Sequence, residues 1–268
     1  MLHGSRTELA ALLPTLPHAQ LVTVDTGPDD GGAKLARDHG ATVIERRDNP
    51  GFGAANNLAL EHVTEDVTVL LNPDTTDNDA LEPLAARATQ TGLHAPRLLN
   101  ADGSVQRSAH PLPGTVGALL PALVHPPLLP RALRERVEPY RAERPRTVGW
   151  TVAACLAART QTLRELGPFD PRIHLFAEDM DLCLRARDRG IPTVLHPDLA
   201  IRHTGRHSVE NEPFEALARN RRDVVERRRG RRARALDDAA QALTFATRAL
   251  VKRPNDRERA QLRALRRA

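Results

Sequence analysis

Aromatic residues and cysteines are scarce in this sequence. Aromatic side chains make up 3% of the 268 residues, with a single Trp and a single Tyr. This scarcity argues against a protein that binds single-stranded nucleic acid by stacking bases on aromatic rings, so no specific nucleic-acid partner is expected. The two cysteines, Cys155 and Cys183, both lie in apolar surroundings. A disulfide framework is therefore not expected, and a reducing, cytoplasmic compartment is.

Long hydrophobic runs are also missing. The longest apolar run, residues 116–130, contains four prolines and a histidine. It is too short to span a bilayer and is expected to form a loop or short helices. The chain length allows one large α/β domain with extensions, which is enough to bury a substantial core.

Basic residues are concentrated near the end of the sequence. Residues 219–268 hold 17 of the 39 Lys and Arg residues but only 6 of the 34 Asp and Glu residues. The pattern predicts a basic helical extension, which binds anionic lipid headgroups, stays a solvated tail or binds nucleic acid non-specifically. Contact with a membrane surface is the favoured interpretation. The extension can also pack on the preceding domain through its apolar residues, which are Val224, Val225, Leu236, Leu243 and Phe245.

Three carboxylates stand together at the start of a predicted helix. Glu178, Asp179 and Asp181 precede a stretch of apolar residues and arginines that ends at Gly190. Acidic side chains are favoured at a helix N-terminus, so part of this cluster can be simple capping. Capping needs one carboxylate, however, and three of them behind the apolar residues 174–176 favour a functional cluster.

Two further acidic turns follow predicted strands. Residues 21–24 form a β-rich run that ends in Asp25, and residues 66–71 form another that ends in Asn72 and Asp74. Asp, Asn and Gly are common in ordinary turns for backbone reasons. A carboxylate just past a strand end is also a good anchor for Mg²⁺ or Mn²⁺, which prefer oxygen ligands. Three acidic motifs at successive element ends favour one common site over three unrelated turns.

A glycine-bracketed turn lies between these two strand ends. Gly51 and Gly53 flank Phe52, and a helix is predicted over residues 54–63. The third glycine of a dinucleotide-binding fingerprint is absent, so that signal is weak. The exposed amides of the helix N-terminus, with Asn57 nearby, suit an anion or a sugar, although Asn57 also fits an ordinary helix surface.

These motifs, in this order, resemble glycosyltransferase family 2. The resemblance is carried by VDTGPDDGG, NPGFGAANN, LLNPD, GPFDPRIHLFAEDMDLCLRARDRG and HPDLAIRHTGRHS, and it covers roughly residues 20–210. The most similar branch contains rhamnosyltransferase-like enzymes that use nucleotide-activated sugars. The resemblance implies an α/β protein of GT-A type, with a Rossmann-like mixed sheet flanked by helices over residues 1–218 and the basic helical extension over residues 219–268.

The resemblance also implies the residues that carry out catalysis. Asp179 matches the catalytic base, Glu178 lies beside it, and Asp181 supports the start of the helix. Residues 149–150 precede a predicted apolar strand over residues 151–158, where the family commonly places an acceptor-side wall that here contains Trp150.

Donor and metal residues are implied in the same way. Asp25 would contact the nucleotide base or ribose, together with the turn formed by Gly51, Gly53 and Asn57. Asp74 matches the last acid of a metal-binding motif whose first acid is replaced by an asparagine here. His203 matches a histidine that lies near the metal and the diphosphate in related enzymes, and this places it in the metal site with Asp74.

The expected reaction is an inverting sugar transfer. A divalent metal, Mg²⁺ or Mn²⁺, would stabilise the nucleoside diphosphate as it leaves. The carboxylate of Asp179 would take the proton from an acceptor hydroxyl that attacks from the opposite face. The expected partners are a nucleotide-sugar donor, with rhamnose as one candidate sugar, and a glycan or lipid-linked acceptor in cell-wall or polysaccharide synthesis. The protein is expected in the cytoplasm, at the inner face of the plasma membrane if the basic extension binds lipid.

One departure from the family pattern concerns the first strand. Residues 1–5 match only the end of that strand and its turn, with a helix predicted over residues 7–16. Most of a central strand is therefore expected to be missing, which would expose neighbouring strand edges. A wrongly placed start codon is the favoured explanation, and a damaged relative is the alternative.

Two other classes of function stay open. A nucleotidyltransferase also combines an α/β nucleotide site with Mg²⁺ and acidic residues, but it usually carries a glycine-rich and basic phosphate loop near its N-terminus, which is not seen here. A non-catalytic relative that acts as a peripheral scaffold through its arginine-rich extension is the other alternative.

Overall fold

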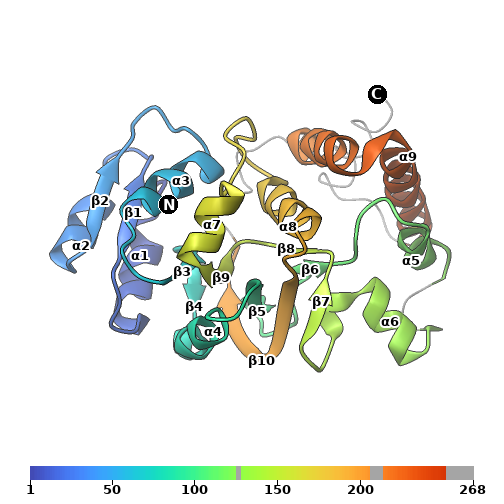
Figure 1. Cartoon of the computed structure of the whole chain (residues 1–268), viewed down its shortest axis with the longest axis horizontal. Helices are drawn as coiled ribbons and strands as arrows, with labels where there is room; N and C mark the ends of the chain where they lie inside the picture. The colour runs from blue at the N-terminus through green and yellow to red at the C-terminus, as the bar shows by residue number, and fades with distance from the viewer. Residues whose placement is uncertain (125–127, 206–213, 252–268) are drawn as a thin grey trace.

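The computed structural model describes residues 1–124, 128–205 and 214–251 (Figure 1). The α-helices of this part of the chain are α1 (Arg6–Leu12), α2 (Gly32–Asp38), α3 (Phe52–Glu61), α4 (Leu81–Arg87), α5 (Leu120–Leu123), α6 (Arg131–Val137), α7 (Thr160–Leu166), α8 (Glu178–Asp188) and α9 (Phe214–Val251). The short 3₁₀ helices are η1 (Leu13–Thr15), η2 (Asn78–Ala80), η3 (Val116–Leu119) and η5 (Pro139–Arg141). The strands are β1 (Val22–Asp25), β2 (Thr42–Glu45), β3 (Val67–Leu71), β4 (Thr75–Thr76), β5 (Leu93–Leu99), β6 (Ala109–His110), β7 (Arg146–Val148), β8 (Trp150–Thr151), β9 (Cys155–Arg159) and β10 (Thr193–His203).

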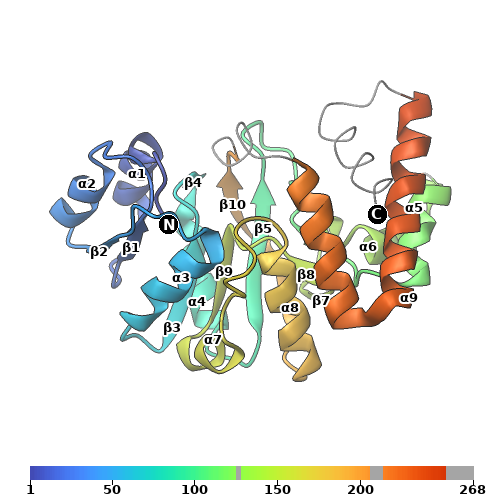
Figure 2. The same ribbon diagram turned by 90° about the horizontal axis from the view of Figure 1, so that it is seen from above.

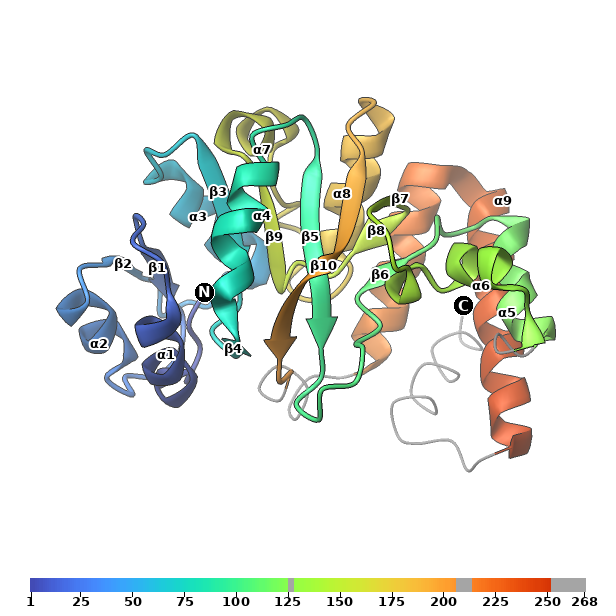
Figure 3. The ribbon, with the colours of Figure 1, turned by 90° about the horizontal axis from the view of Figure 1, so that it is seen from below.

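A mixed sheet forms the centre of the molecule. Its strands lie in the order β3-β9-β5-β10-β4, and β7 also pairs with β10. The β5 and β10 strands are parallel, whereas β3 and β5 run antiparallel to β9. A separate parallel pair, β1 and β2, lies at one end of the molecule, and the short pair of β6 and β8 lies on the other side of the central sheet (Figures 1 and 3). This is the predicted α/β architecture with a mixed sheet.

Alternation along the strands gives the sheet two buried faces. In β9, Leu156 and Ala158 pack with α7 and α8, whereas Cys155 and Ala157 pack with α4 on the opposite face. Successive side chains of a strand point to opposite faces, so an apolar strand covered on both sides reads as a continuous apolar run. Figure 3 shows α4 lying across the face of the sheet that is turned to the viewer.

Two predicted elements are interrupted in the structure. The strand predicted over residues 151–158 is wrong as a continuous element, because a turn separates β8 from β9. The main-chain groups of this turn bond to Asp179 and Asn72 instead of continuing the ladder. The helix predicted over residues 7–16 ends at Leu12 and continues as η1, where Pro14 has no amide hydrogen for an α-helical bond.

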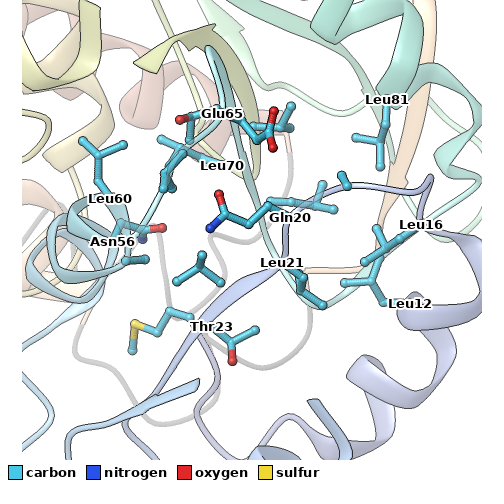
Figure 4. Close-up of a pocket in the computed structure, with 18 of the residues that line it drawn as sticks. Leu12, Leu16, Gln20, Leu21, Thr23, Asn56, Leu60, Glu65, Leu70 and Leu81 are labelled. Carbon is cyan, nitrogen blue, oxygen red and sulfur yellow. The ribbon is translucent and has the colours of Figure 1, made fainter. Parts of the chain in front are cut away.

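A cavity of about 340 Å³ separates β1 from β3 (Figure 4). Its lining is mostly apolar, with Leu21 and Thr23 on the β1 side and Leu60 and Leu70 on the opposite side. At one end, the amide of Leu2 donates to the carbonyl oxygen of Val24 (2.8 Å), and that of Thr26 donates to the carbonyl oxygen of Leu2 (2.9 Å). This short parallel pairing joins residue 2 to the end of β1. Met1 and Leu2 thus lie at one end of this cavity and contribute to its lining.

The apolar stretch at residues 116–130 forms short helices where it is described. η3 and α5 pack against α9, which lies beside them in Figures 2 and 3. Among the residues described, none of the helices combines the length and the apolar character needed to cross a membrane.

The long helix α9 packs on α8 rather than extending away from the domain. Val224 and Val225 are fully buried against Met180 and Leu184 of α8. Gly230 has non-helical dihedral angles and bends α9, so that its second half turns along η3 and α5 (Figure 2). The packing of Val224, Val225 and Phe245 that the sequence offered as an alternative is observed, since Phe245 is also buried.

Candidate active site

The acidic cluster stands at the start of α8, as predicted. Phe176 and Ala177, immediately before the helix, both adopt left-handed backbone conformations with φ of 70° and 71°. Such conformations cost about 1–3 kcal/mol each in residues other than glycine and gather at functional sites. The side-chain amide of Asn220 on α9 donates to the carbonyl oxygens of Leu175 (2.8 Å) and Phe176 (3.4 Å). The strained turn that aims the acidic cluster is therefore held from α9.

Asp179 and Glu178 differ in their surroundings. Asp179 keeps some accessible surface and accepts hydrogen bonds from its neighbour Met180 N–H (2.7 Å) and from Ala153 N–H (3.4 Å). Glu178 is only 6% exposed, and its Oε2 is buried without a hydrogen-bond partner among the described residues. Asp179 is the more exposed of the two residues, so it is the better placed for proton transfer with a bound molecule.

Burial shifts the pKa values of both carboxyl groups upward. Burial raises the pKa of Asp179 from its ordinary value of 3.8 to about 6, although the two amide hydrogen bonds oppose the shift. Burial and the charge of Asp179 raise the pKa of Glu178 well above its ordinary value. Two adjacent carboxyl groups in one enclosure ionise one after the other, so the pair holds a proton at mildly acidic pH.

Asp181 holds the helices together instead of facing the site. Its side chain is fully buried and accepts hydrogen bonds from Arg185 Nε (2.8 Å) and from Arg228 Nε (2.8 Å). Arg185 lies one turn further along α8, and Arg228 comes from α9. A buried carboxylate needs such partners because it has lost its hydration. Asp181 therefore fixes the start of α8 to α9, which extends the predicted supporting role.

Asp74 and His203 meet at the end of the central sheet. Asp74 follows β3, and the antiparallel pairing of β4 with β10 places His203 opposite Thr75. Nε2 of His203 lies 3.4 Å from Oδ1 of Asp74, while the amide of Gly205 donates to Oδ2 (2.9 Å). Burial acts to raise the pKa of Asp74, but His203 and the Gly205 amide outweigh it and hold that pKa below its usual value. Asp74 is therefore ionised at neutral pH.

Hydrogen bonds to Gln106 fix the tautomer of neutral His203. The amide nitrogen of Gln106 donates to Asn100 Oδ1 (3.2 Å) and to the carbonyl oxygen of His203 (3.3 Å). Its Oε1 therefore accepts from Nδ1 of His203 (3.0 Å), so in the neutral ring the lone pair on Nε2 faces the carboxylate of Asp74. The effect of His203 on the pKa of Asp74 belongs to the protonated ring, whose Nε2–H donates to that carboxylate. The carboxylate of Asp74 and Nε2 of His203 are thus adjacent electron-pair donors, and the amide of Gln106 orients the histidine. This arrangement fits a divalent cation. Within the described residues no group of three or more His, Cys, Asp and Glu forms a fuller metal site.

One turn of the chain connects this pair to the acidic cluster. The amide of Asn72 donates to the carbonyl oxygen of Ala154 (2.9 Å), and the amide of the preceding Ala153 donates to Asp179. Asn72 also lies 3.4 Å from Nε2 of His203 through its side-chain nitrogen. The interruption between β8 and β9 thus brings the candidate metal residues and the candidate base to the same edge of the sheet.

Asp25 lies at the end of β1, in a separate part of the site. Its side chain is buried and forms an ion pair with Arg47 (3.2 Å), which also donates to Gly27. Oδ1 of Asp25 accepts from the amide of Gly27 (3.2 Å). The turn after β1 is therefore ordered around Asp25, and Arg47 adds a positive charge that the sequence analysis did not single out.

The glycines of the predicted donor turn allow a close approach to residues 169–174. Gly51 has a φ of 93°, and a Cβ there would collide with the main chain of His174, while a Cβ at Gly53 would collide with Phe169. Asn57 accepts from the amide of Phe169 (3.0 Å) and donates to its carbonyl oxygen (2.9 Å). These three residues hold α3 against the segment that leads into α8, so they support the acidic cluster from the side opposite α9.

Trp150 forms an aromatic platform beside the acidic cluster. Its ring stacks on His110 with the ring centres 4.1 Å apart and the planes inclined by 15°. The guanidinium of Arg221 lies 5.9 Å from the Trp150 ring and is held by Asp237 through bonds of 2.7 Å and 2.8 Å. The positive charge of Arg221 also acts to lower the pKa of Asp179, against the larger effect of burial. One face of the Trp150 ring is therefore covered by His110.

A family model described as glycosyltransferase like family 2 matches residues 22–226 of this chain. Among curated proteins, the N-acetylglucosaminyl-diphospho-decaprenol L-rhamnosyltransferase of Mycobacterium tuberculosis is 29% identical over 238 residues. That alignment covers 81% of this chain and 76% of the relative.

Solved structures with similar folds are more distant in sequence. GalNAc-T7, in a crystal structure with UDP, GalNAc and Mn²⁺, has a TM-score of 0.57 at 15% identity; the match covers 91% of this chain but 48% of that one. Residues 1–349 of S. aureus TarS give a TM-score of 0.55 at 14% identity and cover 97% and 75% of the two chains. The glucosyl-3-phosphoglycerate synthase of M. tuberculosis, with phosphoglyceric acid, gives 0.52 at 17% identity and covers 85% and 77%. These likenesses show a GT-A fold, as predicted.

Proposed function

Because the chain belongs to glycosyltransferase family 2, we propose that it transfers a sugar from a nucleoside-diphosphate donor to an acceptor hydroxyl with inversion at the anomeric carbon. The observation that carries this proposal is the pair of sites joined by residues 152–154. One of them holds the ionised Asp74 beside His203, and the other holds Asp179 with a raised pKa. The site at Asp74 and His203 would stabilise the diphosphate as it leaves. The carboxylate of Asp179 would take the proton of the attacking hydroxyl.

Asp179 is the general base in this proposal. The residue is partly exposed, and the amide of Ala153 donates to its carboxylate (3.4 Å). A base whose pKa lies near the working pH combines a useful ionised fraction with a good affinity for the proton. Glu178 is buried beside it, and the charge of Asp179 helps to raise the pKa of that second carboxyl group. Trp150 would carry the acceptor ring, and Asp25 would contact the nucleoside at the end of β1.

Asp74 and His203 would hold a divalent metal, Mg²⁺ or Mn²⁺, in the same proposal. Such an ion, when bound, neutralises the charge of the leaving diphosphate. Two protein ligands are few, but Mg²⁺ and Mn²⁺ sites are often completed by substrate phosphates and water. Mn²⁺ is present with the nucleotide in the structure of GalNAc-T7, which is compatible with this assignment.

The donor sugar and acceptor class are proposed from the mycobacterial relative. That protein is named for an L-rhamnosyl transfer to an N-acetylglucosaminyl-diphospho-decaprenol. We expect rhamnose or a similar sugar as the donor group and a glycan or lipid-linked saccharide as the acceptor. With such an acceptor, the proposed place of the protein is the cytoplasm at the inner face of the plasma membrane, in cell-wall or polysaccharide synthesis.

Chelation is expected to abolish transfer, and Mg²⁺ or Mn²⁺ to restore it. Replacing Asp74 by Asn should remove the ionised ligand and weaken Mn²⁺ binding in the presence of nucleoside diphosphate, as measured by calorimetry. Asp77→Asn is the matched control, because Asp77 is an exposed neighbour whose ion-pair partner among the described residues is Arg202. Full turnover after thorough chelation would contradict the metal site, and so would equal Mn²⁺ affinities of the Asp74 and Asp77 variants.

Turnover is expected to rise with pH between about 5 and 7. The pKa of Asp179 is raised to about 6, so its base form is scarce below that pH and dominant above it. The same shift makes the folded protein bind a proton that the unfolded chain releases between about pH 4 and 6, so this group's contribution to stability falls as the pH rises through that window. A kcat profile measured from pH 5 to 8 tests the first effect, and a flat profile would remove Asp179 from the role of base.

A further inference from the structure

The exposed large hydrophobic side chains of the described chain gather in one region. Among residues 1–124, 128–205 and 214–251 there are four of them, namely Val116 (72% exposed), Leu123 (68%), Leu128 (78%) and Leu133 (40%). Single exposed apolar residues are common, but a group of them marks an interaction site. We call these four side chains the apolar cap.

The base of the apolar cap is packed firmly on the protein. η3 and α5, which carry Val116 and Leu123, lie against α9. Gly114, just before them, approaches α9 so closely that a Cβ there would collide with Ala233. Figures 2 and 3 show α5 and α6 at the end of the molecule, beside the second half of α9 and far from β1 and β2. The segment is therefore fixed by other residues while its large side chains point to solvent.

Uncompensated positive charge lies beside the apolar cap. Arg136 follows Leu133 by three residues on α6, so both side chains lie on the same side of the helix. Arg136 and Arg144 are exposed and form no ion pair with a described residue. The nearby acidic group Glu135 is paired with Arg131 and with Arg146. Apolar side chains next to free arginines are the pattern of a surface that enters the interface of an anionic bilayer.

The arginines of α9 are a poorer candidate for this contact. Nine arginines lie between residues 219 and 234, and six of them form ion pairs with carboxylates of the described chain. Their partners are Asp170, Asp181, Glu226, Asp237 and Asp238. Most of these arginines are therefore paired with carboxylates of the protein, which makes them less available to lipid than Arg136 and Arg144. Residues 252–268 of the predicted extension lie outside the described residues.

We propose that the apolar cap is a membrane-binding surface, with Val116, Leu123, Leu128 and Leu133 entering the boundary between headgroups and acyl chains of an anionic bilayer. Arg136 and Arg144 then lie against the lipid phosphates. A cavity of about 210 Å³ next to the apolar cap is lined by Leu112, Ala118, Trp150 and Phe245 among others. The bilayer would thus lie next to this cavity, which extends from Ala118 beside the apolar cap to Trp150. The inference concerns a surface and holds whichever sugar is transferred.

Vesicle sedimentation of the full chain tests the proposal. The probes are large vesicles of phosphatidylcholine with one quarter phosphatidylglycerol, and vesicles of phosphatidylcholine alone. Leu123→Ser together with Leu128→Ser should lower the partition coefficient on the anionic vesicles by about tenfold or more, because two exposed apolar side chains lose their gain from leaving water. The melting temperature should not change, since both side chains are already exposed.

The matched control replaces Arg229 and Arg232 by Gln. Both arginines are exposed on α9 and form no ion pair with a described residue, so a small loss that disappears at high salt is expected. The proposal is overturned if the unmodified protein ignores anionic vesicles, if the double leucine variant binds as well as the unmodified protein, or if only the arginine variant loses binding. It is equally overturned if size exclusion shows a dimer that the leucine substitutions dissociate, because the cap is then a protein interface.

A transfer assay on a short water-soluble acceptor separates this proposal from the enzymatic one. Neither pair of substitutions touches the acidic cluster or the Asp74 site, so turnover on that acceptor should stay at the unmodified level. Vesicle binding without any turnover in any version would contradict the proposed activity and leave the membrane surface intact. Turnover without vesicle binding would contradict the membrane surface and leave the proposed sugar transfer intact.

Discussion

Replacing Asp179 by asparagine is expected to lower kcat by about 10²–10⁴-fold, the usual cost of losing a general base. Asparagine keeps the shape of the side chain and can still accept the hydrogen bond of the Ala153 amide, but it cannot take a proton from the acceptor. Donor binding should stay close to that of the unmodified protein, because Asp74 and His203 are untouched. Product assays for turnover, with calorimetry for the nucleotide, measure the two effects separately.

Asp188→Asn is the matched control for this substitution. Asp188 is the last residue of the same helix and is exposed, so the same chemical change there should leave kcat within about a factor of two, as for ordinary surface substitutions. The Asp179 variant should also melt at or above the temperature of the unmodified protein at pH 7, because burial disfavours the charge that the substitution removes. A variant that keeps more than about a third of the turnover would take the role of base away from Asp179.

The elements around the site could be predicted from local sequence pattern. The apolar run at residues 66–71 followed by a polar turn gave a strand whose end carries Asp74, and the acidic start of α8 followed from capping signals. The end of a strand cannot be located from the sequence when the turn that interrupts an apolar run contains no polar residue. The stretch from Thr151 to Ala158 contains no such residue at its break, so nothing local showed where β8 ends.

The contacts that join α8 to α9 leave no local signal in the sequence. Arg228 bonds to Asp181 across 47 residues, and Asn220 bonds to Leu175 across 45. Arginines that face carboxylates and arginines that face water look alike in a basic run, because the side chain alone does not show the tertiary partner. The tautomer of His203 was unpredictable for the same reason, since it depends on Gln106, 97 residues away.

Removing residues 219–268 is expected to unfold the protein instead of only detaching a tail. The deletion exposes the α8 side chains Met180 and Leu184 that pack with Val224 and Val225, and burying an apolar side chain of this size contributes about 1.5–3 kcal/mol. It also removes Arg228 from the fully buried Asp181, and breaking a buried pair costs about 3–5 kcal/mol. Together these losses equal much of the roughly 5–15 kcal/mol that stabilises a folded domain. Urea melts and circular dichroism of the shortened chain would show the loss of cooperative unfolding.

Two adjacent arginines allow the same point to be tested without deletion. Arg228→Met should lower the free energy of unfolding by about 3 kcal/mol, at the low end of the range for a broken buried pair, because Arg185 still contacts Asp181. Arg229→Met should change it by no more than about 0.5 kcal/mol, since Arg229 is exposed and has no ion pair within the described chain. Urea melts of both variants give the comparison directly. If the two substitutions cost the same, α9 does not hold the acidic cluster in place through Asp181. The strained turn before α8 is then held by Asn220 and by the packing of Val224 and Val225.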